Sequence, residues 1–287
     1  MKPENTYKLI IASFILLIIL ACNALGPVPT VTPSPVAPTG TIIPTATDVA
    51  TSVPPSPTAT IAPTSTPPPL SQQVTLISTS FNETNQSPPY TITSQTPQLA
   101  GSDDPRAQAF NQRLNDLVQK EVDLHRQGFL QNPVPPITEN GSSLDVTYAL
   151  VSQSGDIWSL KLTFSFYSDG AAHPGHYSMT VNFDLGQGRE LALGDLFLPN
   201  SNYLEAISQY CITELSKQPF FEGPFRDGAA PTPENYRNWN IAPEGLMITF
   251  DEYQVAPYAA GPQTVIVPYS SLQAVINPEG PLAGAIP

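Results

Sequence analysis

A proline-rich segment limits how much of this 287-residue chain can enter a compact core. Residues 23–70 contain 13 prolines, 11 threonines and 4 serines among 48 positions, and Asp48 is the only charged residue among them. Such a composition buries too little apolar surface to offset the conformational entropy that ordering would remove. Its prolines favour the extended polyproline II conformation. We therefore predict a disordered linker over residues 23–72 that acts as a spacer, with a polyproline ligand for another protein as the alternative.

The segment before this linker is predicted to be an export signal. Residues 9–21 form an apolar run that only Ser13 interrupts, and Lys2 and Lys8 precede it. As a helix, this run would span about 20 Å, which is short of the roughly 30 Å of a bilayer core. We therefore predict a signal peptide over residues 1–22 rather than a permanent membrane span.

The end of this signal resembles the lipobox of bacterial lipoproteins in the residues Ile19-Leu20-Ala21-Cys22. The resemblance implies that the Cys22 thiol is diacylated and that Cys22 becomes the mature N-terminus. Two or more acyl chains attach a protein stably, whereas a single chain anchors it only marginally. We therefore expect a lipoprotein anchored to the cell membrane at its extracytoplasmic face. The alternative is an ordinary signal peptide or a short membrane anchor with an incidental cysteine.

The charge and the cysteine content exclude several classes of protein. Acidic residues outnumber basic residues by 24 to 11, which gives a formal net charge of −13 at pH 7. The sequence has no cluster of lysines or arginines, which excludes a nucleic-acid partner because phosphate contacts dominate that kind of binding. Two cysteines are too few for a disulfide-rich scaffold. Residues 73–287 carry the entire net charge, so the folded part is predicted to be acidic.

From residue 73 onward, the spacing of apolar residues predicts a mixed α+β fold. Strict alternation in residues 144–150 and 158–166, with a turn between them, indicates a β-hairpin. Helical spacing predicts helices over residues 103–128 and 202–215, and a helical turn is expected near residues 236–239. Further strands are predicted at residues 74–81, 90–93, 177–185, 246–250 and 264–268. Strands with one polar face favour an antiparallel sheet with helices packed on one face.

Few residues are candidates for catalysis. Cys211 lies on the apolar stripe of the second helix, where a buried structural cysteine is expected. His173 and His176 lie on a turn and lack the helical spacing typical of zinc ligands. Nucleophile-elbow, phosphate-loop and calcium-loop motifs are absent from the sequence, and its carboxylates are spread out. We therefore predict no catalytic residue, metal or cofactor, with a wall-active or metal-dependent hydrolase that uses His173 and His176 as an alternative.

A long loop between the last two predicted strands is the strongest candidate for a binding site. Residues 251–263 exceed the usual length of a strand-to-strand connection, and long loops in compact domains tend to be functional. Tyr253 and Tyr258 offer contact area at low entropic cost. A loop folded back over the core as a lid is the alternative. The candidate partner-binding residues are His173, His176, Asp251, Glu252, Tyr253 and Tyr258.

Several motifs in the C-terminal half of the chain resemble a known family of envelope domains. They are Tyr167-Ser168-Asp169-Gly170-Ala171-Ala172-His173-Pro174, Asn182-Phe183-Asp184-Leu185-Gly186, Leu191-Ala192-Leu193-Gly194-Asp195-Leu196-Phe197, the run from Phe250 to Gly261, and Ile266-Val267-Pro268-Tyr269. In this order they resemble the RsiV-like domain of unknown function, which is the extracellular domain of lysozyme-sensing anti-sigma factors. Related domains accompany some peptidoglycan deacetylases.

This resemblance implies an α+β fold without catalytic residues, in which the C-terminal domain is similar to a subdomain of actin/Hsp70-type ATPases. It covers about residues 143–275, and residues 74–130 look more weakly like the smaller domain that usually precedes it. We therefore expect a small α+β domain at residues 73–136 and an RsiV-like α+β domain at residues 137–287. The sigma-binding segment and membrane span of the sensors, and the deacetylase domain, have no counterpart in the sequence.

Together these features predict a non-catalytic cell-envelope lipoprotein whose tethered domain binds a lysozyme-like protein or a cell-wall glycan. An acidic domain attracts cationic partners at long range, in a salt-dependent way. The alternatives are the hydrolase described above and a structural module for envelope assembly.

Overall fold

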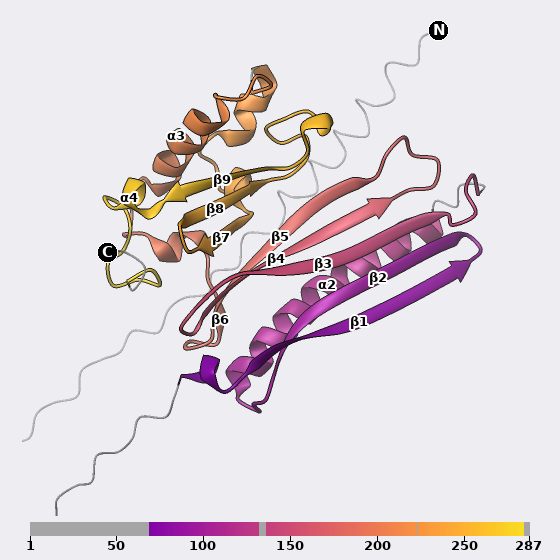
Figure 1. Ribbon diagram of the computed structural model, residues 1–287, viewed down its shortest axis with the longest axis horizontal. Helices are drawn as coiled ribbons and strands as arrows, with labels where there is room; N and C mark the ends of the chain where they lie inside the picture. The colour runs from indigo at the N-terminus through magenta and orange to yellow at the C-terminus, as the bar shows by residue number, and fades with distance from the viewer. Residues whose placement is uncertain (1–68, 132–135, 222, 284–287) are drawn as a thin grey trace, which may run out of the picture. The chain divides into compact units, whose positions relative to one another are not determined.

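The computed structural model describes residues 69–131, 136–221 and 223–283 (Figure 1). The predicted signal peptide over residues 1–22, its Cys22 and nearly all of the predicted linker lie outside the described residues. Within the part that is described, no helix is both long and apolar enough to span a lipid bilayer. Leu70–Gln72, at the end of the predicted linker, forms a 3-10 turn whose Leu70 is buried in the core of the larger sheet.

Six strands form the larger of two sheets, in the order β1-β2-β3-β4-β5-β6 (Figure 1). Neighbouring strands are antiparallel except β2 and β3, which are parallel because helix α2 connects them as a crossover. The strands are β1 Thr75–Gln86, β2 Pro89–Ala100, β3 Ser142–Ser154, β4 Ile157–Tyr167, β5 Gly175–Asp184 and β6 Arg189–Glu190. The predicted α+β class and the hairpin of β3 and β4 are confirmed. The sheet takes strands from both sides of residue 136, where the division into two domains remains a prediction.

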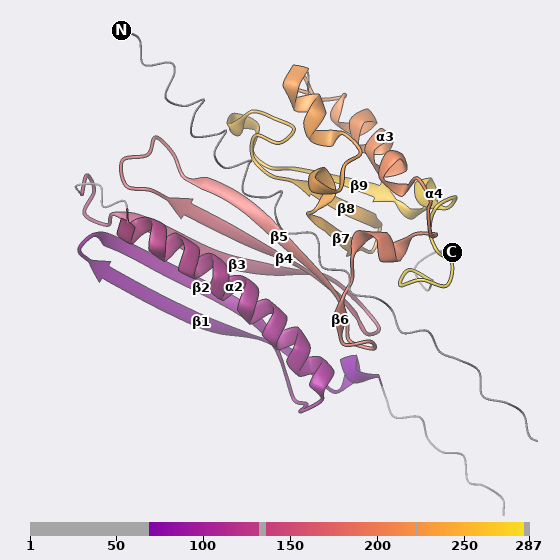
Figure 2. The same cartoon turned by 180° about the vertical axis from the view of Figure 1, so that it is seen from behind.

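Helix α2, Pro105–Gln131, packs lengthwise against this sheet, as both views show (Figures 1 and 2). Its apolar stripe meets the alternate residues of β4 that the sequence pattern predicted to face the core. Phe110 is fully buried, and its ring lies 5.4 Å from that of Phe183 in an edge-to-face arrangement. The main residues of this first core are Phe110, Leu114, Leu117, Val118, Val122, Trp158, Leu160, Leu162 and Phe164.

A second core lies under the smaller sheet, which has the strand order β7-β8-β9 and is antiparallel throughout. Its strands are β7 Trp239–Ala242, β8 Gly245–Phe250 and β9 Gln263–Pro268, and they are accompanied by helices α3 Tyr203–Leu215 and α4 Tyr269–Leu272. Cys211 of α3 is completely buried in this core, and burial raises the pKa of its thiol to about 12. The predicted buried structural cysteine is confirmed.

The connection between α3 and β8 differs from the prediction. The helical turn expected near residues 236–239 is the 3-10 turn Pro233–Tyr236, and Trp239–Ala242 then forms the unpredicted strand β7. All four residues of β7 are buried, the polar Asn240 included, and a strand of four residues is too short for its pattern to stand out in the sequence. Other 3-10 turns are Leu193–Leu196, Gly223–Ala229 and Tyr258–Ala260.

Side chains of the larger sheet close the outer edge of β7. The Trp239 N–H donates to Thr180 Oγ1 at 3.1 Å, and the Trp239 carbonyl accepts from Asn182 Nδ2 at 2.8 Å. The Ile241 N–H donates to both Ser159 Oγ at 3.1 Å and Asn182 Oδ1 at 3.2 Å. Ser159 lies on the face of β4 opposite its core residues, so the two sheets meet through a buried layer of polar contacts.

The variant Asn182→Ala tests this polar layer. The substitution leaves the Trp239 carbonyl without its partner and removes one of the two acceptors of the Ile241 N–H. We therefore expect the free energy of unfolding to fall by about 2 kcal/mol. Urea denaturation followed by circular dichroism measures this change. Gln112→Ala, which removes an exposed amide from α2, serves as the control and should change stability by less than about 0.5 kcal/mol. Equal effects of the two variants would contradict the assignment.

Candidate functional site

The turn that carries His173 and His176 meets the long loop after β8, although the two segments are about 76 residues apart in the sequence. His176 is the second residue of β5, and Glu252 follows the end of β8 by two residues. The His176 ring donates through Nδ1 to Glu252 Oε1 at 2.8 Å, and the His176 backbone N–H donates to Glu252 Oε2 at 3.1 Å. Glu252 therefore holds both the backbone and the side chain of His176.

Asp251 holds the next part of the same strand. Its Oδ1 accepts the Ser178 backbone N–H at 2.8 Å, and its Oδ2 accepts from Arg237 Nη2 and Asn238 Nδ2, both at 3.0 Å. Its side chain is only 10% exposed. Burial raises the pKa of this carboxyl above its ordinary value, against the opposing effect of the hydrogen bonds it accepts.

These two carboxylates accept backbone donors along a stretch of sheet edge that no strand covers. On its outer side β5 pairs with β6 only at Phe183 and Asp184, so the N–H groups of His176 and Ser178 have no strand partner there. Unpaired backbone donors at a sheet edge favour pairing with other chains. Asp251 and Glu252 accept these two N–H groups in place of a neighbouring strand. The loop after β8 is therefore fixed to the larger sheet at its first two residues.

Three aromatic rings lie beside these contacts of Asp251 and Glu252. We call His173, Tyr253 and Tyr258 the aromatic patch. The rings of His173 and Tyr258 are stacked, with centroids 3.8 Å apart and planes inclined by 23°. Tyr258 also donates through its hydroxyl to the Pro174 carbonyl at 2.8 Å. The Tyr253 ring also stacks against that of Tyr258, with centroids 5.8 Å apart. Tyr253 is 57% exposed.

The backbone presents Tyr253 in an unusual conformation. Its φ is +65°, in the left-handed region that residues other than glycine rarely adopt. The following Gln254 side chain donates to the carbonyls of Gly228 and Asn235, at 3.0 and 2.9 Å, and so fastens the loop at this turn. Tyr253 is therefore kept exposed to solvent although a left-handed backbone conformation costs of order 1–3 kcal/mol for a residue other than glycine.

All six residues predicted to contact a partner lie together in the structure. Asp251 and Glu252 are used internally as acceptors, whereas the members of the aromatic patch are exposed or half-buried. That any of them contacts a partner stays a prediction. Sequence reasoning missed Arg237 and Asn238, which bind Asp251, because nothing in their local sequence marks them. Among the described residues, no group of three or more His, Cys, Asp or Glu side chains is placed to hold a metal ion.

Comparison with known proteins finds a family match in the C-terminal part of the chain. Residues 194–270 match the family described as protein of unknown function (DUF3298). The match includes α3, the smaller sheet, and the loop with Tyr253 and Tyr258, whereas His173 and His176 precede it. The more specific RsiV-like assignment stays a prediction.

Two solved structures share the fold. A DUF3298 family member from Bacteroides fragilis aligns with a TM-score of 0.56 and 15% identity over 74% of this chain and 96% of that one. A DUF3298 family protein from Pseudomonas aeruginosa aligns with a TM-score of 0.52 and 13% identity over 71% and 95% of the two chains. Both alignments cover far more of the chain than residues 194–270, so they include at least part of the larger sheet.

Two curated relatives are similar in sequence over part of their length. The peptidoglycan-N-acetylmuramic acid deacetylase PdaC of Bacillus subtilis is 26% identical over 144 residues, which cover 49% of this chain and 30% of PdaC. The immunogenic protein MPT64 of Mycobacterium tuberculosis is 24% identical over 111 residues, covering 39% of this chain and 49% of MPT64. The chain thus spans at most about half the length of these relatives.

The variant Glu252→Ala tests how this site is anchored. It removes the acceptor of the His176 N–H, and hydrogen bonds to charged groups contribute roughly 1.5–3 kcal/mol, so hydrogen exchange at the His176 amide should become at least about tenfold faster. The Ser178 amide, bonded to Asp251, should keep its protection. Amide exchange measured by NMR gives both rates, with the exposed Glu244→Ala as control. Unchanged exchange at His176 would show that Glu252 does not hold the strand.

Proposed function

We propose that this protein is a non-catalytic lipoprotein of the cell envelope whose aromatic patch binds a partner at the cell wall. The observation that carries the proposal is the stack of His173, Tyr258 and Tyr253, which two distant segments build on a firmly bonded base. Exposed rings held in place in this way lose little entropy on binding and offer large contact areas. A partner that packs against the faces of the rings gains this contact without reordering the loop.

A cell-wall glycan is the first candidate partner. The exposed ring surfaces suit the apolar faces of sugar rings, and the Tyr258 hydroxyl, which donates its proton to the Pro174 carbonyl, can still accept a hydrogen bond from a sugar hydroxyl. The similarity to PdaC, which its name describes as a peptidoglycan-N-acetylmuramic acid deacetylase, supports a role related to the wall. In this reading the DUF3298 domain contributes recognition of the wall and no chemistry.

A lysozyme-like protein is the second candidate, and the net charge of −13 favours it. Acidic surfaces accelerate association with cationic proteins, and the effect weakens as salt is added. The resemblance to the RsiV-like domain of lysozyme-sensing proteins agrees with this candidate. Salt dependence separates the two partners, since binding of an uncharged glycan depends little on ionic strength.

Calorimetry on the purified full-length protein tests the patch. We expect Tyr253→Ala and Tyr258→Ala each to weaken binding of lysozyme or of an N-acetylglucosamine oligomer by at least about tenfold, as for aromatic residues at the centre of an interface. Leu124→Ala on α2 is the control, because Leu124 is 58% exposed and Tyr253 57%. Binding of lysozyme should weaken between about 0.05 and 0.5 M salt, whereas binding of the oligomer should not.

The proposal fails if neither ligand binds at low salt, or if the tyrosine variants bind as well as the original protein does. Circular dichroism of each variant confirms that the fold is retained. An effect of Leu124→Ala as large as that of Tyr253→Ala would place the interface elsewhere.

Substitution of each of the two cysteines tests the proposed lipid anchor separately. We expect Cys22→Ala to move the protein from the membrane fraction to the soluble fraction of expressing cells, because the acylated thiol is lost. Cys211→Ala is the matched control and should leave the protein with the membrane, since Cys211 is buried in the second core. Mass spectrometry of the mature N-terminus measures the acyl chains directly. Membrane association of the Cys22→Ala protein would contradict lipid anchoring through this residue.

A further inference from the structure

In the described part of the chain, some edge strands have hydrogen-bond partners on their outer side and others have none. Asp251 and Glu252 close the outer edge of β5, and side chains from the larger sheet close the outer edge of β7. Strand β9 is the other outer strand of the smaller sheet. Among the described residues, no side chain or strand pairs with its outward backbone groups. The outer edge of β9 therefore has unpaired backbone groups, in contrast to those of β5 and β7.

The hydrogen-bond pattern shows which backbone groups of β9 point outward. The Thr249 N–H of β8 donates to the Asn238 carbonyl at 2.9 Å, on the side of β7. Backbone direction alternates along a strand, so Ile248 and Phe250 point toward β9, where they pair with Val265 and Gln263. The N–H and C=O groups of Thr264 and Ile266 consequently point away from β8. They can accept one more strand without disturbing the existing pairs.

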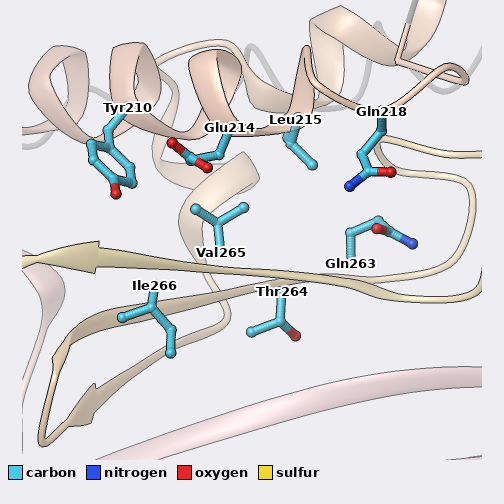
Figure 3. A pocket seen from close by; sticks show the side chains of 8 residues that line it. All are labelled: Tyr210, Glu214, Leu215, Gln218, Gln263, Thr264, Val265 and Ile266. Carbon is cyan, nitrogen blue, oxygen red and sulfur yellow. The ribbon is translucent and has the colours of Figure 1, made fainter.

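A groove of about 200 Å³ lies between this edge and α3 (Figure 3). Figure 3 shows Tyr210, Glu214 and Leu215 directed from α3 toward Val265 of β9. The remaining lining residues are Gln218, Gln263, Thr264 and Ile266. The volume is below the roughly 300–1,000 Å³ of typical small-molecule sites, so it suits a single side chain of a longer ligand.

The charge of the groove selects the kind of side chain. Glu214 is the only charged residue that lines it, and no lining residue is basic. Lys217, just after the end of α3, pairs with Glu214 at 2.7 Å, but its side chain is 63% exposed. Such surface pairs contribute at most about 1 kcal/mol, so a second cation can share or replace this contact.

We propose that β9 receives an extended peptide segment of a partner protein as a fourth strand, with one lysine or arginine of the peptide placed in the groove beside Glu214. Backbone pairing along a sheet edge supplies affinity in this mode, and the groove supplies specificity. The site is separate from the aromatic patch and does not depend on the function proposed for it.

Two variants of Ile266 test the strand addition in the full-length protein. The probe is a fluorescent peptide of sequence Thr-Val-Lys-Val-Thr, blocked at both ends, and its binding is followed by fluorescence anisotropy. Ile266→Pro removes an outward N–H but no pair with β8, so we expect the Kd to rise at least about tenfold. Ile266→Ala keeps the N–H and should raise the Kd less than about threefold.

Further variants test the charge preference of the groove. The original protein should bind the lysine peptide at least about tenfold more tightly than the same peptide with glutamate in place of lysine. Glu214→Gln should remove most of this preference, whereas Glu205→Gln, an exposed carboxylate on the same helix, should preserve it. If Ile266→Pro does not fold, a peptide methylated on its central amide nitrogens makes the same test from the ligand side and should bind at least about tenfold more weakly.

Each of three results would overturn the proposal. The first is no binding of the lysine peptide at about 1 mM, which is the weakest affinity the proposal allows. The second is equal binding by Ile266→Pro and the original protein, or by the methylated and unmethylated peptides. The third is a preference for lysine that survives Glu214→Gln, which would place the cation outside this groove.

Discussion

The structure depends on one constraint: backbone groups at a strand edge need a hydrogen-bond partner where that edge is buried away from water. Side chains meet this requirement at two edges. Thr180, Ser159 and Asn182 pair with the outer edge of β7, and Asp251 and Glu252 pair with that of β5. The same hydrogen bonds join the two sheets. Closing the edges and packing the sheets together are therefore one physical arrangement.

This arrangement also positions the aromatic patch. Asp251 and Glu252 fix the start of the loop after β8, and Tyr258 returns to the turn of His173 through the stacked rings and the Pro174 carbonyl. The part of the loop from Asp251 to Tyr258 is thereby held at both ends, with Tyr253 exposed between them. A recognition surface of this kind is preorganised, so binding need not order a long flexible loop.

Local pattern in the sequence predicted much of the fold and little of the site's geometry. The alternation of apolar and polar residues predicted β3 and β4, and the helical spacing of apolar residues predicted α2, because each of these elements has one polar and one apolar face. Strand β7 was missed because four residues are too few to show a clear pattern. The candidate residues were chosen from loop length and composition, but the contact of His176 with Glu252 joins positions 76 residues apart, and only folding brings them together. Arg237 and Asn238 reach Asp251 across 14 and 13 positions of the sequence, and folding is needed to form these contacts too.

The central claim is that the aromatic patch is the surface that meets a wall component. An NMR titration of isotope-labelled protein with lysozyme, and separately with an N-acetylglucosamine oligomer, tests it most directly. We expect the largest shifts at the amides of His173, Tyr253 and Tyr258, with little change along α2. Saturable shifts that cluster on another face of the molecule and leave these amides unmoved would contradict the claim.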